Sequence, residues 1–141
     1  MGREVLFACN ITGTQMVGDK KHILVVDDDP LLVRLNKRQL ENSGYDVSIT
    51  TESTDVLELL RNNPGTYHLL VTDLIMPGLS GRGLLEKVGI QSPDLPIIVL
   101  TGQLDRETEQ ELLALGAKAI VGKPVFGNEL VAVIDRVLAE E

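Results

Sequence analysis

The chain is poor in cysteine and histidine, and each shortage argues against a class of site. Its single cysteine, Cys9, excludes an internal disulfide framework or a zinc site built from cysteines, and it fits a cytoplasmic location. The two histidines, His22 and His68, fall at or inside apolar runs that are far apart in the sequence. We therefore interpret them as strand residues rather than as metal ligands or catalytic bases.

Basic and aromatic residues are also scarce. The chain has 13 Lys and Arg against 21 Asp and Glu, a formal net charge of −8, and only 3% of its residues are aromatic. Nucleic-acid phosphates are bound by clustered Lys and Arg, with aromatic residues between them where bases stack. The sequence contains no such cluster, so we expect no direct nucleic-acid binding, and partners that are proteins or small ions.

Long hydrophobic runs are missing as well. No run approaches the length that spans a membrane, and VLFAC near the start is too short for the core of a signal peptide, so we expect no membrane partner. Hydrophobic residues nevertheless make up 43% of the 141 residues, enough for the core of one domain. Residues 1–20 lack a sustained period, and we expect a poorly ordered N-terminal arm before a domain at 21–141.

From residue 22 onward, five apolar runs alternate with five helical patterns. The first helix has the clearest signals, with Asp29 at the N-cap, Pro30 at the first helical position and Gly44 after its end. Its apolar residues include the leucines Leu31, Leu32, Leu35 and Leu40. The expected strands cover residues 22–26, 45–50, 68–72, 97–100 and 119–121, and the expected helices cover residues 30–43, 53–62, 82–90, 107–115 and 128–139.

This alternation predicts the fold class. Strands that are apolar on both faces and are joined by helical crossovers form a parallel sheet covered on both sides. We expect a doubly wound α/β domain, a flavodoxin-like (βα)5 three-layer sandwich with strand order 2-1-3-4-5. Ligands of such sheets bind outside the carboxyl ends of the strands, near the point where the strand order reverses.

The residues after the first and third strands are acidic. Asp73 directly follows the expected third strand, and Pro77-Gly78 then force a turn. Such an acid either caps the turn through its own backbone or is a reactive carboxylate held by a rigid scaffold. Asp27 and Asp28 follow the first strand, so we expect them to converge with Asp73, where like charges repel. Because oxygen-only ligation suits Mg²⁺, the cluster predicts a magnesium site.

Two further polar residues follow the fourth and fifth strands. Thr101 alone could be an ordinary strand-end threonine, Lys123 alone a solvated lysine, and Asp29 only a helix cap. Together, the hydroxyl and the amine supply hydrogen-bond donors for an anionic group, and one of the neighbouring carboxylates can act as a nucleophile toward phosphorus. The combination indicates a phosphoryl-transfer pocket.

Four sequence blocks, ILVVDDDP, VTDLIMPG, VLTG and GKPV, resemble in order and spacing the signature blocks of response-regulator receiver domains of two-component phosphorelay systems. The resemblance covers about residues 22–139. It implies that Asp73 is the phosphoacceptor, which takes a phosphoryl group from the phosphohistidine of a sensor histidine kinase or phosphotransfer protein. It also implies that Thr101 moves to the phosphoryl oxygen, that Lys123 pairs with that group, and that the Lys123-Pro124 bond is cis.

The same resemblance implies a Mg²⁺ site held by Asp27, Asp28 and Asp73, with the backbone carbonyl of Ile75 as a further ligand. The chain departs from the family at Ile120, where many receivers carry Tyr or Phe. A ring that swings inward is therefore absent at this position. The run ELLALGAKAIVGKP is similar to receivers attached to hybrid sensor kinases.

A receiver of this kind is not an enzyme with an external substrate, since it catalyses only its own phosphorylation and dephosphorylation. It switches a protein-binding surface for a downstream protein that the sequence does not identify, and a phosphorylation-dependent dimer is compatible with the resemblance. Two alternatives stay open. One is a haloacid-dehalogenase-like phosphatase, whose nucleophile motif resembles Asp27-x-Asp29, although Leu31 stands where that motif has Thr or Val. The other is a pseudo-receiver, a binding module that is never phosphorylated.

Overall fold

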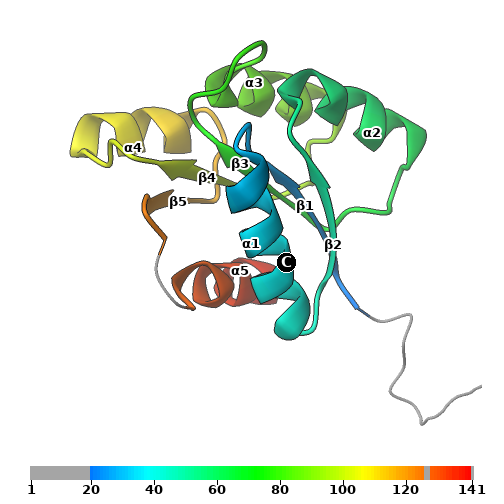
Figure 1. Ribbon diagram of the computed structural model, residues 1–141. Coiled ribbons are helices and arrows are strands. Elements are labelled where there is room, and N and C mark those ends of the chain that lie inside the picture. Colours follow the sequence, from blue (N-terminus) through cyan, green and yellow to red (C-terminus); the bar gives the residue numbers. More distant parts are fainter. Residues whose placement is uncertain (1–19, 126–127, 141) are drawn as a thin grey trace, which may run out of the picture.

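The structure, a computed structural model, describes residues 20–125 and 128–140. Five parallel strands form one sheet in the order β2-β1-β3-β4-β5, which confirms the expected doubly wound topology (Figure 1). The expected arm, residues 1–20, lies outside the described residues apart from Lys20. The strands are β1 (His22–Val26), β2 (Asp46–Thr50), β3 (Leu69–Asp73), β4 (Ile97–Thr101) and β5 (Ala119–Gly122).

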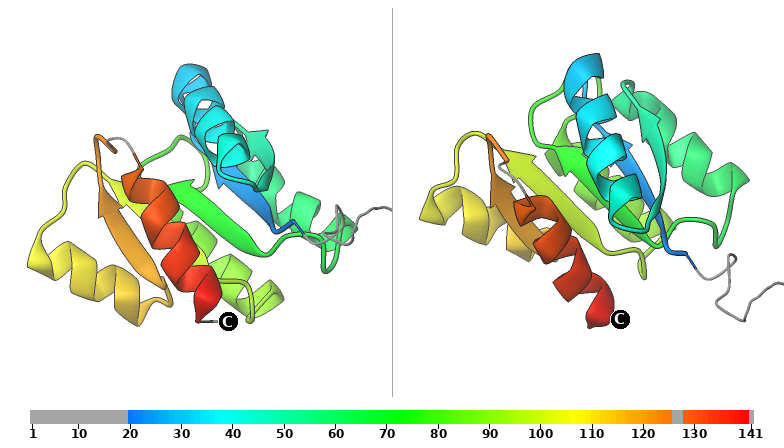
Figure 2. Two further views of the ribbon diagram at one scale, coloured as in Figure 1. Left: turned by 90° about the horizontal axis from the view of Figure 1, so that it is seen from below. Right: turned by 60° about the horizontal axis from the view of Figure 1, so that its bottom comes forward.

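Helices cover both faces of the sheet. Two of them, α1 (Pro30–Asn42) and α5 (Glu129–Ala139), lie on one face, as both views of Figure 2 show. The opposite face carries α2 (Val56–Asn62), α3 (Gly81–Gln91) and α4 (Arg106–Ala114). A short 3₁₀ helix, η2 (Ser53–Asp55), precedes α2. The expected ends differ from these by at most one residue, except that the expected second helix begins with this 3₁₀ turn.

Alternation along each strand builds two cores. In β1, Ile23 and Val25 pack with residues of α1 and α5, whereas Leu24 and Val26 pack with residues of α2, α3 and α4. Successive strand residues point to opposite faces, so a run of apolar residues buries both. All four of these side chains are at most 1% exposed. The central strands are therefore rigidly held, and so are the residues at their carboxyl ends.

The apolar residues of α1 divide between its two sides. Leu40 is fully buried, together with Val33, but Leu31 and Leu35 are 63% and 52% exposed. At 3.6 residues per turn, Val33 and Leu40 point the same way, and Leu31 and Leu35 point roughly to the opposite side. Leu32, between these directions, is 37% exposed. The first turns of α1 thus present leucines to the surface.

Candidate functional site

The carboxyl ends of β1 and β3 bring three acids together. Val26 pairs with Thr72 in the parallel ladder, so the next residues, Asp27 and Asp73, emerge side by side. Asp27 is 1% exposed and Asp73 is 8% exposed, whereas Asp28 lies at the surface. Carboxylate oxygens of the three residues all lie within 4.8 Å of one another. The predicted convergence of these acids is thus present in the structure.

Asp27 is the most deeply buried of the three acids. Its Oδ1 accepts a hydrogen bond from the Asp29 backbone N–H at 3.0 Å. Its buried Oδ2 has no hydrogen-bond partner among the described residues, although Lys123 Nζ lies 3.5 Å away. Burial raises the pKa of the Asp27 carboxyl, and the nearby charges of Asp73 and Asp28 act in the same direction, against the backbone hydrogen bond and Lys123. The pocket therefore holds an acceptor oxygen that favours a cation.

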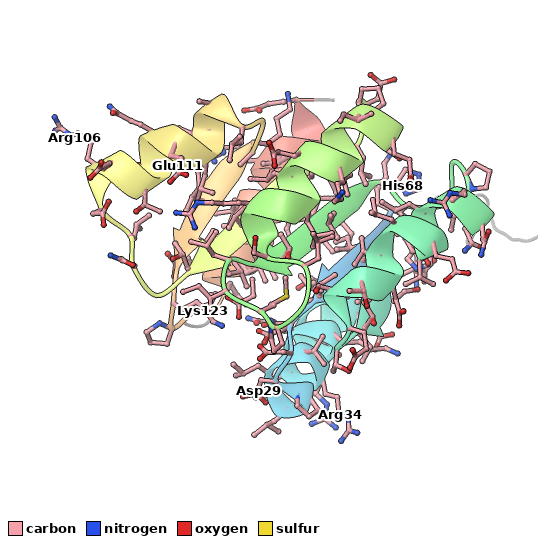
Figure 3. All side chains as sticks on the ribbon, turned by 90° about the horizontal axis from the view of Figure 1, so that it is seen from above. Asp29, Arg34, His68, Arg106, Glu111 and Lys123 are labelled. Carbon is pink, nitrogen blue, oxygen red and sulfur yellow. The ribbon has the colours of Figure 1, made fainter. Side chains whose placement is uncertain are left out.

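Lys123 reaches the acids from the end of β5. Its Nζ donates to Asp73 Oδ2 at 3.0 Å, and the Lys123–Pro124 peptide bond that follows is cis. Burial by itself would lower the pKa of Lys123, but the hydrogen bond to Asp73 and the charges of Asp73 and Asp27 raise it above the ordinary value. Lys123 is therefore a cation at neutral pH. Figure 3 shows it at the same end of the sheet as Asp29.

The remaining oxygen of Asp73 faces its own loop. Asp73 Oδ1 accepts from the Leu74 backbone N–H at 3.1 Å, and the same N–H donates to the Leu100 carbonyl of β4 at 2.9 Å. Leu100 is the ladder partner of Asp73, so Thr101 lies one residue further along the neighbouring strand. Thr101 is 1% exposed, and its Oγ1 accepts from the Gln103 N–H at 3.0 Å.

The loop that follows Asp73 packs back against the strand end. The Gly81 N–H donates to the Leu74 carbonyl at 2.8 Å, which closes the loop at its base. A Cβ at Gly81 would lie 2.7 Å from the Asp73 carbonyl oxygen, so this approach needs glycine. Within the loop the Met76 side chain is buried, whereas Ile75 is 73% exposed. The base of the loop is therefore fixed, whereas the Ile75 side chain lies at the surface.

The donor set suits a small hard cation. Three carboxylates within one another's reach supply oxygen ligands only, which Mg²⁺ prefers over nitrogen or sulfur. Asp27 Oδ2, buried and without a hydrogen bond within the described residues, supplies an acceptor for a cation beside the Lys123 ammonium group, which lies 3.5 Å away. The residues present therefore fit Mg²⁺, whereas Asp29 is used otherwise, since its side chain caps α1 by accepting from the Leu31 and Leu32 amides.

The contacts of two groups, Ser53 and the two histidines, were not predicted from the sequence. Ser53 is 3% exposed and hydrogen-bonds to the loop after Asp73, a contact between residues more than twenty positions apart that no pattern in the sequence signals. His22 and His68 touch, because the His22 backbone N–H donates to His68 Nδ1 at 2.9 Å. Figure 3 places His68 at the end of the sheet away from Lys123. Parallel pairing of β1 with β3 brings the histidines together, so the expected strand order was enough to predict this contact.

Comparison with known proteins agrees with this geometry. A family model described as the response regulator receiver domain matches residues 23–135. The chain is 36% identical over 108 residues to the two-component response regulator ARR10 of Arabidopsis thaliana, which covers 77% of this chain and 19% of the relative. It is 32% identical over 117 residues to the response regulator SaeR of Staphylococcus aureus, with coverages of 83% and 50%. The chain thus spans half or less of these relatives.

Solved structures give the same result. A response regulator receiver domain protein, described as CheY-like, from Methanospirillum hungatei JF-1 matches with a TM-score of 0.79 and 33% identity, over 86% of this chain and 95% of that one. A receiver domain protein from Clostridium thermocellum matches with a TM-score of 0.79 and 29% identity, over 85% and 95%. Sequence families, relatives and structures agree, and the chain therefore belongs to the response regulator receiver domain family of two-component systems.

Proposed function

We propose that this domain accepts a phosphoryl group on Asp73 from the phosphohistidine of a sensor histidine kinase or phosphotransfer protein. The observation that carries the proposal is the pairing of a buried Asp73 carboxylate with Lys123 at 3.0 Å, beside an oxygen of Asp27 that accepts no hydrogen bond from the described residues. Such a donor acts in the cytoplasm, and we place this domain there. Like other receivers, it signals rather than turning over an external substrate.

Asp73 is the nucleophile of the proposed reaction. One of its carboxylate oxygens attacks phosphorus, the P–N bond to the donor imidazole breaks, and the bonding electron pair stays on the imidazole nitrogen. Asp27, Asp28, Asp73 and the Ile75 carbonyl would hold Mg²⁺, which when bound neutralises negative charge on the phosphoryl group. Lys123, already charged and positioned, supplies a second positive charge to the oxygens of the arriving group.

The surface beside the acids supports a protein as the donor. Leu32 lines a hollow of about 310 Å³ together with Asp27 and Lys123. Leu31 and Leu35, on the same end of α1, are more than half exposed. Apolar side chains around a charged pocket bury area and exclude water when another protein covers them. A protein that carries a phosphohistidine fits this surface better than a free small metabolite does.

The output of the domain follows from the added charge. A phosphoryl group adds a charge of about −2 near neutral pH, and it favours whichever conformation gives Lys123 and Thr101 closer contact with it. Ile120, half-buried against the core beneath α4, offers no aromatic ring to relay that change. We therefore propose that the surface of α4 and β5 changes through small shifts that a downstream protein, or a second copy of the domain, recognises.

The test is intact-mass measurement after incubation with acetyl phosphate and Mg²⁺. Wild type should gain the mass of one phosphoryl group, whereas Asp73→Asn and a sample containing a magnesium chelator should not. An unmodified wild type would identify the domain as a pseudo-receiver. Turnover of a phosphate monoester that depends on Asp27 would instead favour the phosphatase alternative, which the capping role of Asp29 already weakens.

A further inference from the structure

The segment before α2 holds the loop that follows Asp73. Ser53, in η2, is 3% exposed, and its Oγ donates to the Pro77 carbonyl at 3.1 Å. The same oxygen accepts from the Leu79 backbone N–H at 3.0 Å. A serine hydroxyl has one donor and two acceptor lone pairs, so one side chain satisfies both backbone groups. Ser53 thus bridges two residues on either side of Gly78.

Gly78 allows η2 and the loop to lie against each other. Its φ of +80° belongs to the left-handed region. A Cβ built on Gly78 would lie 3.2 Å from Thr54 Cγ2 and 3.5 Å from Ser53 Oγ. The loop therefore rests directly on Ser53 and Thr54, and the two hydrogen bonds of Ser53 are part of a packed contact.

These bonds fix the middle of the loop, whose base is fixed separately. At the base, Leu74 is held through its N–H by Asp73 and Leu100, and through its carbonyl by Gly81. Two residues, Ile75 and Met76, lie between Leu74 and the part that Ser53 holds, and the Met76 side chain is buried. A backbone segment this short, restrained on both sides, has little freedom. The direction of the Ile75 carbonyl therefore depends on both restraints.

We propose that Ser53 is a positioning residue for the cation site, which it supports by holding the loop that carries the Ile75 carbonyl. The proposal rests on the function proposed above, since it assigns that carbonyl to Mg²⁺. Ser53 touches neither the cation nor the phosphoryl group. Its effect is to keep a ligand in place before the cation arrives, so that binding does not have to order the loop.

The test measures Mg²⁺ binding by calorimetry without any phosphodonor, followed by the phosphorylation rate with acetyl phosphate. Ser53→Ala should weaken Mg²⁺ binding about tenfold, the lower end of what losing a group that supports a metal ligand costs. At saturating Mg²⁺ much of the phosphorylation rate should return. Ser53→Cys, which fills the space but bonds weakly, should behave similarly.

The matched control is Ser48→Ala, which removes a hydroxyl in the middle of β2 that bonds His22 Nε2 at 2.7 Å, at the amino end of β1. It should lower thermal stability while leaving Mg²⁺ affinity within about twofold of wild type, well short of the tenfold loss expected at Ser53. Wild-type affinity in both Ser53 variants would overturn the proposal, as would an equal loss in Ser48→Ala. Failure of the proposed function looks different, because wild type would then bind Mg²⁺ without becoming phosphorylated.

Amide exchange provides a readout that does not depend on the cation. In wild type, the Leu79 N–H should be protected by Ser53 and the Gly81 N–H by the Leu74 carbonyl. Ser53→Ala should speed exchange at Leu79 and leave Gly81 protected. Rapid exchange at Leu79 in wild type would show that the bridge is not maintained in solution, and would overturn the proposal even if the variants failed to fold.

Discussion

Asp27 shows how a single residue can serve a site at the expense of the fold. Its Oδ2 is buried, and the charges of Asp28 and Asp73 lie close by. Taking a carboxylate oxygen out of water without a hydrogen bond costs free energy, and neighbouring like charges add to that cost. Lys123 compensates only in part, at 3.5 Å from Asp27 and 3.0 Å from Asp73.

We therefore expect Asp27→Asn to raise the free energy of unfolding by roughly 1 kcal/mol when Mg²⁺ is absent. The amide oxygen of asparagine can still accept from the Asp29 N–H, but the incompletely compensated charge is gone. The raised pKa of Asp27 sets the sign of the pH dependence: the cost is present when the carboxyl is ionised and disappears as pH falls through that pKa. Urea unfolding in the presence of a chelator measures the difference, which should shrink on acidification.

The residues of the pocket could be predicted from the sequence because strand exits determine their positions. Once the order 2-1-3-4-5 is assumed, the residues after β1, β3, β4 and β5 must lie at one edge, whatever the loops do. Ser53 could not be predicted in this way. Its partners, Pro77 and Leu79, belong to an irregular loop whose course is decided by packing against η2.

At the scale of elements, the start of α3 is fitted to the end of β3. Gly81 opens the helix, and a Cβ there would lie 2.7 Å from the Asp73 carbonyl oxygen and 2.8 Å from Leu74 Cα. Both neighbours are backbone atoms that cannot withdraw cheaply, because the Asp73 carbonyl accepts from Thr72 Oγ1 and Leu74 is held through its N–H and its carbonyl. At Gly89, near the other end of the same helix, no described atom outside its chain neighbours and the helix's own backbone lies within 4 Å of the corresponding position.

This contrast gives a matched pair of variants. Gly81→Ala should destabilise the domain by about 2 kcal/mol, because the methyl group forces α3 away from the strand end. Gly89→Ala should stabilise it by up to about 1 kcal/mol, since alanine loses less entropy in a helix and meets no neighbour. Thermal unfolding measures both, and equal effects of the two substitutions would contradict the fit described for α3.

Element positions were predictable from periodicity, but the orientation of α1 was not. Four of its first eleven residues are leucines, and they occur on more than one side of the helix. Val33, a single branched residue between Leu32 and Arg34, is the one that joins Leu40 in the core. The buried side is the one that meets the sheet, and that depends on the turn from β1 into α1, which ends at the Asp29 cap, rather than on the helix itself.

At the scale of the whole molecule, lowering the pH changes stability in opposite directions at the two ends of the β1–β3 pair. The carboxyl end holds Asp27, whose cost falls as pH is lowered. The amino end holds His68, whose Nδ1 accepts the His22 N–H and must be unprotonated to do so. Burial lowers the pKa of His68 below its ordinary value of 6.5, and the charges of Lys21 and His22 lower it further.

The lowered pKa of His68 determines whether the domain gains or loses stability as the pH falls. Between its lowered folded pKa and 6.5, the unfolded chain binds a proton that the folded chain does not, so stability falls as pH decreases through this range. His68→Gln, which keeps an acceptor but does not titrate, should lose less stability than wild type between pH 7 and pH 5.5. Urea unfolding at several pH values tests this, and parallel curves for the two proteins would contradict it.

The hollow at the amino edge of the sheet marks a place where the domain can be attached to a label, a support or another protein. Lys21, just before β1, and Leu138, near the end of α5, both line this hollow of about 700 Å³, together with His68 and Pro96 at the starts of β3 and β4. Asp73 lies at the opposite ends of these strands. An attachment near Lys21 or Leu138, such as a fluorophore, a solid support or a fused protein, therefore lies at the amino edge of the sheet. The acids at the carboxyl edge stay open to an approaching partner.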